Sequence, residues 1–517
     1  MSDRVICLPD ITSDEHAARP ALLGRTTLTY GELATAVHAV AHRLGELGAA
    51  LGDRVVIWMD KRPEYVQAML GALHRGCAYV AVDGAHPASR LTTIVADTDP
   101  ILLVTDERHL SQIVHLDLPA SVRAAVVVGR ISGVSAKVRT VTWSDFVAGA
   151  GAGAGAVGQV PRMAVTPSSL AAILYTSGST GMPKGVQISH SNLGAFIDWA
   201  CDELDVGDTD VFANHASFNF DLSTFDLFVA ISVGAAMWII DDELARDPAV
   251  LADGIREHGV TVWYSVPSIL TLLTACGALA PDTVRGLRYV LFAGEVYPKP
   301  RLLELAAQLH ERTQLYNLYG PTETNVCTYH RVTAHDLDRA EPLPLGLPVG
   351  GAKLLVVDDH GLPIDGPGVG ELVVEGDCVT PGYWRREREP IAEQHRQRRH
   401  PTGDLVSRVD GHLVYRGRKD RMVKLSGYRI ELGEIESVIV RHSSIDEAAV
   451  IVAGEGSAGQ LAAFYTVRPG APELTLLDLK RHCARYLPRY MVPRKAVRVE
   501  TLPRNANGKI DYRRLAG

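Results

Sequence analysis

The segment from Tyr175 to Gly185 (YTSGSTGMPKG) combines glycines, hydroxyl side chains and a lysine directly after an apolar run. Glycines allow successive backbone N–H groups to converge on an anion, the hydroxyls add donors, and the lysine adds positive charge. We therefore predict that this segment holds a triphosphate, and the long string disfavours the alternative of a flexible polar turn. The residues expected to contact the phosphates are Thr176, Ser177, Gly178, Ser179, Thr180, Gly181 and Lys184. The spacing G-x-x-x-x-G-K-[ST] is absent, so a P-loop NTPase fold is not indicated.

Short β-rich runs must position this loop. They lie at residues 171–175, 260–266, 289–293 and 313–318, and they alternate with helical patterns such as residues 298–309. This alternation predicts a parallel α/β sheet. After about residue 420 the pattern changes to short strands and two amphipathic helices, near residues 434–442 and 476–487. We expect a small α+β domain there.

The overall composition excludes several classes of protein. The 517 residues are too many for one hydrophobic core, and 46% hydrophobic residues with a net charge of -8 indicate neither a nucleic acid nor a membrane as partner. The longest apolar stretch, residues 229–240, is too short to cross a bilayer and is predicted to be a buried strand with its approach. The N-terminal residues do not resemble a secretory signal, so a cytoplasmic protein is expected.

Cysteine spacing and one low-complexity stretch complete this survey. The seven cysteines include no C-x-x-C pair, which argues against a zinc site and a disulfide framework. Residues 148–155 alternate Ala and Gly, which predicts a surface loop, with a domain linker as the alternative.

Ten further motifs accompany the phosphate loop along the chain. They are LTYGEL (28–33), GCAYV (76–80), FDLS (220–223), NLYGPTET (317–324), GEL (370–372), GYW (382–384), TGD (402–404), GRKD (417–420) with the run that continues to residue 436, LPRYMVP (487–493) and NGKID (507–511). In this order the sequence resembles the adenylate-forming superfamily, in particular the amino-acid adenylation domains of nonribosomal peptide synthesis. The resemblance implies a large N-terminal α/β domain over residues 1–419 and a small, mobile α+β domain over residues 420–517, with a hinge near Asp420.

The resemblance also implies how ATP is bound. Glu323 should bind Mg²⁺, and Thr322 should hold phosphates together with the glycine-rich loop. Tyr319 should stack on adenine, Asn317 should read its exocyclic amine, and Asp404 should accept both ribose hydroxyls. The same nucleotide site is expected to include Gly294, Glu295, Gly320 and Arg418. Taken alone, Asp404 would be interpreted as a solvated turn residue, but its place in the series of motifs favours the ribose.

Catalysis is expected to involve two lysines and two arrangements of the small domain. Lys184 and the Mg²⁺ held by Glu323 should neutralise phosphate charge, and Thr322 should hold the phosphates in place. Lys509 should contact both the substrate carboxylate and the developing phosphate charge. A second half reaction must then admit a pantetheine thiol where Lys509 acted. The family achieves this by rotating the small domain, which here would bring residues 424–427 into the site. Because the chain ends soon after Asp511, the thiol is expected to come from a separate carrier protein.

Asp221 distinguishes among members of the superfamily. In those that activate amino acids, this position pairs with the substrate ammonium, whereas acyl- and aryl-acid ligases have no use for a carboxylate here. An unpaired buried Asp is costly, which favours a cationic partner over the alternative of a helix cap. The remaining pocket positions are bulky and apolar: Leu222, Phe225, Tyr264, Leu291, Ala293, Leu318, Val326 and Cys327, with Lys509 completing the set.

This set of side chains predicts a small, apolar amino acid as substrate. It resembles the set of L-proline-activating enzymes, including free-standing ones that feed pyrrole-2-carboxyl formation on a carrier protein. Size alone leaves valine and pipecolate open. An acyl- or aryl-CoA ligase of the same fold, and a nucleotide-binding relative without catalysis, are the remaining alternatives.

Overall fold

The phosphate-loop segment lies at the edge of a seven-stranded sheet. A computed structural model describes residues 14–113, 115–131, 138–148, 163–178, 182–280, 284–339, 341–454, 459–471, 474–504 and 510–516. The strand order is β7-β6-β5-β3-β4-β8-β9, with parallel pairing except between β8 and β9. The strands are β3 (Arg54–Met59), β4 (Ala78–Asp83), β5 (Leu102–Asp106), β6 (Ala124–Val128), β7 (Thr140–Thr142), β8 (Leu170–Thr176) and β9 (Lys184–Ser189).

A second, nine-stranded sheet carries most of the other motifs. Its order is β16-β15-β14-β13-β12-β10-β11-β1-β2, and its centre is parallel. The strands are β1 (Pro20–Leu23), β2 (Leu28–Thr29), β10 (Val211–Asn214), β11 (Ala236–Ile239), β12 (Val262–Ser265), β13 (Tyr289–Phe292), β14 (Gln314–Tyr319), β15 (Thr328–Arg331) and β16 (Leu347–Pro348). The runs predicted near residues 260, 289 and 313 are three adjacent strands here. The run at residues 171–175, by contrast, belongs to the other sheet, so the single predicted sheet is two.

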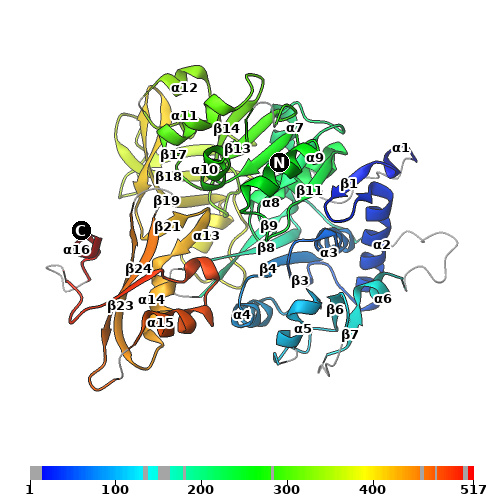
Figure 1. Ribbon diagram of the computed structural model, residues 1–517, viewed down its shortest axis with the longest axis horizontal. Coiled ribbons are helices and arrows are strands. Elements are labelled where there is room, and N and C mark those ends of the chain that lie inside the picture. The colour runs from blue at the N-terminus through cyan, green and yellow to red at the C-terminus, as the bar shows by residue number, and fades with distance from the viewer. Residues whose placement is uncertain are drawn as a thin grey trace.

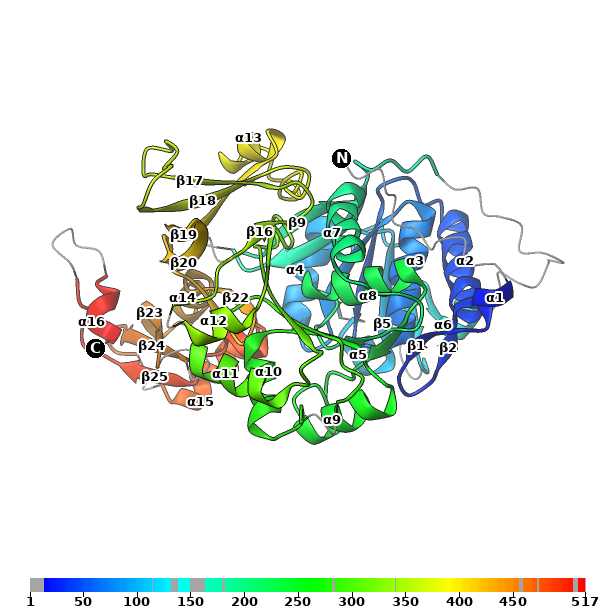
Figure 2. The same ribbon diagram turned by 90° about the horizontal axis from the view of Figure 1, so that it is seen from above.

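Successive side chains of a strand point to opposite faces of its sheet, and both faces of each sheet are buried. In β3, Val55 and Ile57 join the core beneath one layer of helices, whereas Val56 and Trp58 join the core on the opposite face. The first of these cores also contains inward side chains of the second sheet, so a helical layer lies between the sheets (Figures 1 and 2). Together these layers form the large α/β part of the chain.

The helices of this part differ from prediction in one place. They are α1 (Asp14–Ala17), α2 (Tyr30–Glu46), α3 (Pro63–Arg75), α4 (Ala88–Thr98), α5 (Glu107–Ile113), α6 (Trp143–Ala148), α7 (His190–Glu203), α8 (Leu222–Val233), α9 (Pro248–Glu257), α10 (Pro267–Ala275), α11 (Lys299–Gln308) and α12 (Ala334–Asp338). The apolar stretch 229–240, predicted as a buried strand with its approach, contains the buried strand β11, and the approach is the end of the helix α8. A helix buried on all sides has no polar face, and its sequence is then as uniformly apolar as that of a buried strand. Within the described residues, no helix is long and apolar enough to cross a bilayer.

A four-stranded antiparallel sheet follows and leads to the end of the large part. It contains β17 (Lys353–Val357), β18 (Val369–Glu375), β19 (Arg399–Val409) and β20 (His412–Arg418), with α13 (Ile391–Arg396) between β18 and β19. We call the described residues up to 418 the N-terminal body. Most of the Ala/Gly stretch predicted as a loop lies outside the described residues.

The described residues from 422 to 516 form what we call the C-terminal lobe. It contains β21 (Met422–Leu425), β22 (Tyr428–Glu431), β23 (Ile445–Ala453), β24 (Gln460–Val467) and β25 (Lys495–Arg498), with α14 (Leu432–Val440), α15 (Leu476–Ala484), a 3₁₀ turn at Arg489–Met491 and α16 (Tyr512–Ala516). Its own apolar core includes Ile435, Ile439, Val450 and Cys483. Asp420 lies between the last strand of the body, β20, and the first strand of the lobe, β21.

Candidate active site

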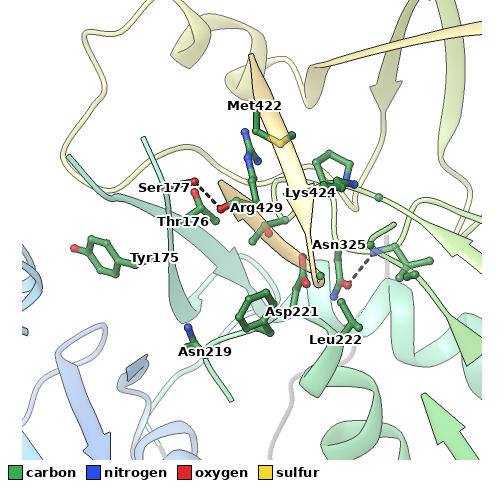
Figure 3. A pocket seen from close by; sticks show the side chains of 18 of the residues that line it. Tyr175, Thr176, Ser177, Asn219, Asp221, Leu222, Asn325, Met422, Lys424 and Arg429 are labelled. Atoms are coloured by element: carbon green, nitrogen blue, oxygen red, sulfur yellow. Dashed lines mark hydrogen bonds between the residues drawn. The ribbon is translucent and has the colours of Figure 1, made fainter. Parts of the chain in front are cut away.

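The motif residues converge where strands of both sheets end and the lobe meets the body. One cavity of about 70 Å³ lies there, and side chains of both parts line it (Figure 3). Its lining residues are Tyr175, Thr176, Ser177, Asn219, Phe220, Asp221, Leu222, Tyr264, Ala293, Gly294, Gly320, Pro321, Thr322, Asn325, Val326, Met422, Lys424, Gly427, Arg429 and Tyr490. Ligands of α/β sheets bind at such carboxyl ends of strands. The cavity is smaller than the roughly 300 Å³ of an ordinary ligand pocket, and residues of the lobe form part of its lining.

Asp221 occupies the N-cap position of α8 and faces the cavity. Its side chain makes no capping hydrogen bond, which separates it from the alternative of a helix cap. Burial raises the pKa of its carboxyl, and a hydrogen bond from the Thr322 hydroxyl and the nearby Lys424 ammonium oppose that shift. A cation bound beside Asp221 would favour the ionised form further.

The predicted pocket positions divide into two groups. Leu222, Tyr264, Ala293 and Val326 line the cavity together with Asp221. The other four are packed in the layer behind it and do not line it: Phe225, Leu291, Leu318 and Cys327. Phe225 meets the Tyr264 ring edge-on at a centroid distance of 5.3 Å, so it shapes the cavity through Tyr264. The Tyr264 hydroxyl is buried and has no hydrogen-bond partner among the residues that the structure describes.

The glycine-rich segment joins β8 to β9 as a hairpin, in which Thr176 pairs with Lys184. The Ser177 hydroxyl donates to the backbone oxygen of Arg429 at 2.8 Å, and the Gly178 N–H donates to a Glu434 carboxylate oxygen at 3.3 Å. The Lys184 ammonium lies 5.1 Å from the centre of the Tyr383 ring. Ser179, Thr180 and Gly181 lie outside the described residues.

Glu323 is the most enclosed carboxylate of the site, with a side-chain exposure of 0%. The Tyr383 hydroxyl donates to one of its oxygens at 2.6 Å, and Arg429 donates to the other at 2.6 Å. Burial alone would raise the pKa of Glu323, but Arg429 and His400 outweigh it and hold the pKa well below its ordinary value. Glu323 is therefore ionised.

The residues assigned to the nucleoside make hydrogen bonds of their own. Arg418 donates to Asp404 at 2.6 Å and also to Asp420, and the Tyr319 hydroxyl donates to the second oxygen of Asp404 at 2.5 Å. Asn317 donates its amide to the Pro344 carbonyl at 2.9 Å. Tyr319, Asn317, Asp404 and Arg418 do not line the cavity in this arrangement, whereas Gly294 and Gly320 do.

Sequence comparisons place this geometry among known proteins. The profile of the AMP-binding enzyme family matches residues 10–384, and that of the AMP-binding enzyme C-terminal domain matches residues 434–509. The chain belongs to the AMP-binding enzyme family. Such enzymes use ATP.

Two full-length relatives and one solved structure extend this result. The chain is 57% identical over 514 residues, 99% of this chain and 96% of the relative, to the L-proline--[L-prolyl-carrier protein] ligase of Streptomyces coelicolor. It is 39% identical over 490 residues, 95% of this chain and 94% of the relative, to the enzyme of the same name from Pseudomonas fluorescens. The amide bond synthetase McbA of Marinactinospora thermotolerans, at 22% identity, shares the fold with a TM-score of 0.84 over 97% of both chains.

In this AMP-binding enzyme the lobe places a strand and turn into the site. Lys424 and Gly427 line the cavity, and the Lys424 ammonium lies 5.5 Å from the centre of the Tyr319 ring. Burial lowers the pKa of Lys424, and Asp404 is the largest opposing influence. Glu295 accepts a hydrogen bond from the Gly427 N–H at 2.8 Å.

Lys509 lies outside the described residues. The flanking Arg504 and Ile510 pair as a β-bridge, and α16 after them packs against β23. Figures 1 and 2 show α16 at the outer end of the lobe.

Sequence analysis did not single out three residues that this site depends on. Arg429 and Glu434 fall within the motif run 417–436, but nothing in the run indicates their partners. Lys61, with 1% side-chain exposure, donates to the carbonyl oxygens of Asn214 at 3.1 Å, His215 at 2.9 Å and Ala216 at 3.4 Å. Lys61 thereby fixes the start of the loop that carries Asp221.

The arginine-rich stretch after Trp384 contains internal ion pairs. Arg386 pairs with Glu389 at 2.7 Å, and Arg396 pairs with Glu393 at 2.6 Å. This agrees with a solvated helix face rather than a nucleic-acid patch.

Proposed function

We propose that this AMP-binding enzyme activates L-proline with ATP and transfers the prolyl group to the phosphopantetheine thiol of a separate peptidyl carrier protein. In the first step a proline carboxylate oxygen bonds to the α-phosphorus of ATP, the bond to the bridging oxygen breaks, and pyrophosphate leaves. In the second step the thiol sulfur attacks the acyl carbon and AMP leaves. Both relatives above are named for this activity, and the similarity covers 96% and 94% of their lengths.

The observation that carries the proposal is a single carboxylate in an otherwise apolar part of the cavity. Asp221 faces Leu222, Ala293 and Val326, none of which can hydrogen-bond through its side chain. A zwitterion with an apolar ring satisfies both features, because its ammonium pairs with Asp221 and its ring packs on the apolar side chains. A fatty or aromatic acid would bring no ammonium group to Asp221.

Glu323 fits the role of the Mg²⁺ ligand. It is ionised and enclosed, and Mg²⁺ in nucleotide sites is usually bound by one or two carboxylates together with phosphate oxygens. Glu323 would hold the ion beside the glycine-rich loop, where the ion would neutralise charge on the triphosphate. Thr322, Lys184 and the loop N–H groups would orient the same phosphates.

The observed position of the lobe suits the thiol-transfer step. Lys424, Gly427 and Arg429 fill the side of the cavity where a triphosphate would extend. Adenylation therefore requires the lobe to turn away and bring Lys509 to the substrate, and Asp420, between β20 and β21, is the proposed hinge. The proposed boundary between the two domains is at residues 419 and 420.

A panel of amino acids tests the proposal. Pyrophosphate release should be greatest with L-proline and should need no coenzyme A, and the carrier protein should then gain a prolyl thioester detectable by its mass. Preference for valine or pipecolate would correct the substrate while keeping the reaction. Turnover of an acyl or aryl acid with coenzyme A, but of no amino acid, would overturn the proposal.

A further inference from the structure

The chain that follows Lys509 packs on the arginine that follows the proposed hinge. Tyr512 begins α16, and the guanidinium carbon of Arg421 lies 3.3 Å from the centre of the Tyr512 ring. The Tyr512 hydroxyl lies 3.5 Å from a carboxylate oxygen of Glu436. Arg421 comes directly after Asp420, and Tyr512 comes three residues after Lys509. The contact therefore joins the hinge end of the lobe to the end that contains Lys509.

Arg421 is itself fixed within the lobe. Its guanidinium donates to both carboxylate oxygens of Glu436, at 3.1 and 2.9 Å, and to the Val450 carbonyl at 2.7 Å. The Val450 N–H in turn donates to Glu436 at 2.7 Å. These bonds use the edge of the planar guanidinium and leave its face for an aromatic ring. Because Glu436 lies in α14 and Val450 in β23, Arg421 connects both of these elements to α16.

The chain on both sides of Lys509 is tied to the same part of the lobe. Before Lys509, Arg504 pairs with Glu447 of β23. After Lys509, α16 has only five residues, and a helix of this length is not stable in water without packing against other elements. The contact of Tyr512 with Arg421 supplies such packing at the first residue of the helix.

We propose that Tyr512 and Arg421 are positioning residues for adenylation, which hold the chain around Lys509 in place when the lobe turns about Asp420. The inference rests on the proposed function, because it takes Lys509 to act in adenylation. Tyr512 and Arg421 both follow the hinge, so their contact moves with the lobe and is kept in both arrangements. In the observed arrangement α16 lies at the outer end of the lobe, and none of its described residues lines the cavity (Figures 1 and 2). The contact should therefore matter for adenylation and not for thiol transfer.

Tyr512→Leu tests the inference. A cation–π contact corresponds to a factor of roughly 2 to 30 in an equilibrium, so proline-dependent pyrophosphate exchange should fall about tenfold. Loading of the carrier protein from preformed prolyl-AMP should change by less than about twofold. Amide hydrogen exchange of residues 510–516, followed by mass spectrometry, should become about tenfold faster, with the rest of the lobe unchanged. Tyr512→Phe keeps the ring on Arg421 and should restore pyrophosphate exchange to within about twofold of the unsubstituted enzyme.

Tyr486→Leu is the matched control. The Arg441 guanidinium lies 5.7 Å from the centre of the Tyr486 ring, in a contact within the lobe that involves neither α16 nor the hinge. Its loss should leave both half reactions unchanged. Arg421→Met combined with Tyr512→Leu should be no slower in pyrophosphate exchange than Arg421→Met alone, because both substitutions remove one contact.

Equal losses in pyrophosphate exchange and loading would overturn the inference, because the contact would then maintain the fold of the lobe. Faster amide hydrogen exchange throughout the lobe would have the same meaning. Lys509→Ala separates the inference from the proposed function. Normal pyrophosphate exchange by Lys509→Ala would contradict the role of Lys509 in the proposed function. Loss of pyrophosphate exchange in Lys509→Ala together with normal exchange in Tyr512→Leu would overturn the inference alone.

Discussion

Arg90→Met should separate the two half reactions. Arg90 in α4 and Glu434 in α14 form an ion pair between body and lobe, with a distance of 2.9 Å and 3% exposure of each side chain. The pair exists only while the lobe is docked as observed. Loss of the pair should therefore slow thiol transfer. In the adenylation arrangement both groups are expected to be apart and hydrated.

The expected size follows from the burial of the pair. Removing one partner of a buried ion pair costs about 3–5 kcal/mol, because the other charge is left without compensation. At 1.4 kcal/mol for each factor of ten, the docked arrangement becomes roughly 10²- to 4 × 10³-fold less populated. Glu434 keeps its contact with the Gly178 N–H, which favours the lower end of this range.

Two assays measure the outcome. Proline-dependent exchange between ATP and pyrophosphate reports the first half reaction, and single-turnover loading of carrier protein from preformed prolyl-AMP reports the second. Arg90→Met should slow loading by about 100-fold or more while changing exchange by less than about twofold. Arg90→Met combined with Glu434→Met should recover part of the loss, since an apolar pair removes the buried charge.

Equal losses in exchange and loading would refute this reasoning, because they would show that the pair maintains the fold of the body. Unchanged loading would refute it as well, since the observed docking would then be irrelevant to thiol transfer.

Three further predictions concern the body and the final loop. Lys61→Met should lower the free energy of unfolding by about 3 kcal/mol, since three carbonyls each lose the hydrogen bond from the ammonium, at about 1 kcal/mol each. Denaturant unfolding measures this change, and the KM for proline should rise while that for ATP does not. Burial raises the pKa of Asp221, so acidification should protonate Asp221 and raise the KM for proline. Asp221→Asn should leave activation of proline low at every pH, so this dependence on pH should be absent. A KM for proline independent of pH in the unsubstituted enzyme would contradict the ionic contact. Lys509→Ala should abolish pyrophosphate exchange but spare carrier loading, and Asp420→Pro should do the reverse; normal exchange by the lysine variant would remove Lys509 from the mechanism.

Features encoded by neighbouring residues could be predicted from the sequence. The hairpin between β8 and β9 and the strands β12 to β14 follow from local apolar runs and turn residues, and the change of pattern near residue 420 coincides with the passage from body to lobe. For residues 229–240 the buried strand was predicted, but not that a helix leads into it, because a helix buried all round resembles a strand in composition. Phe225 and Cys327 were expected in the cavity wall, but alignment by motif does not distinguish a lining side chain from one that supports it.

Contacts between the two parts of the chain could not be predicted in this way. Arg429 and Glu323 are 106 residues apart, and Arg90 and Glu434 are 344 apart. Each of these residues has an ordinary local context, and a charged side chain without its partner is usually solvated. Only the packing of the lobe against the body identifies these pairs. This packing is one of at least two arrangements that the proposed cycle requires.

The charge balance of the docked site depends on which cations lie beside its two carboxylates. Glu323 and Asp221 lie near one cavity, and Lys424 and Arg429 of the lobe supply positive charge to it. Without the lobe, both carboxylates require other cations, which ATP with its metal and the ammonium of proline provide. In the proposed cycle, departure of ATP and proline would leave both carboxylates without these cations, and Lys424 and Arg429 of the docked lobe would then supply the compensating charge.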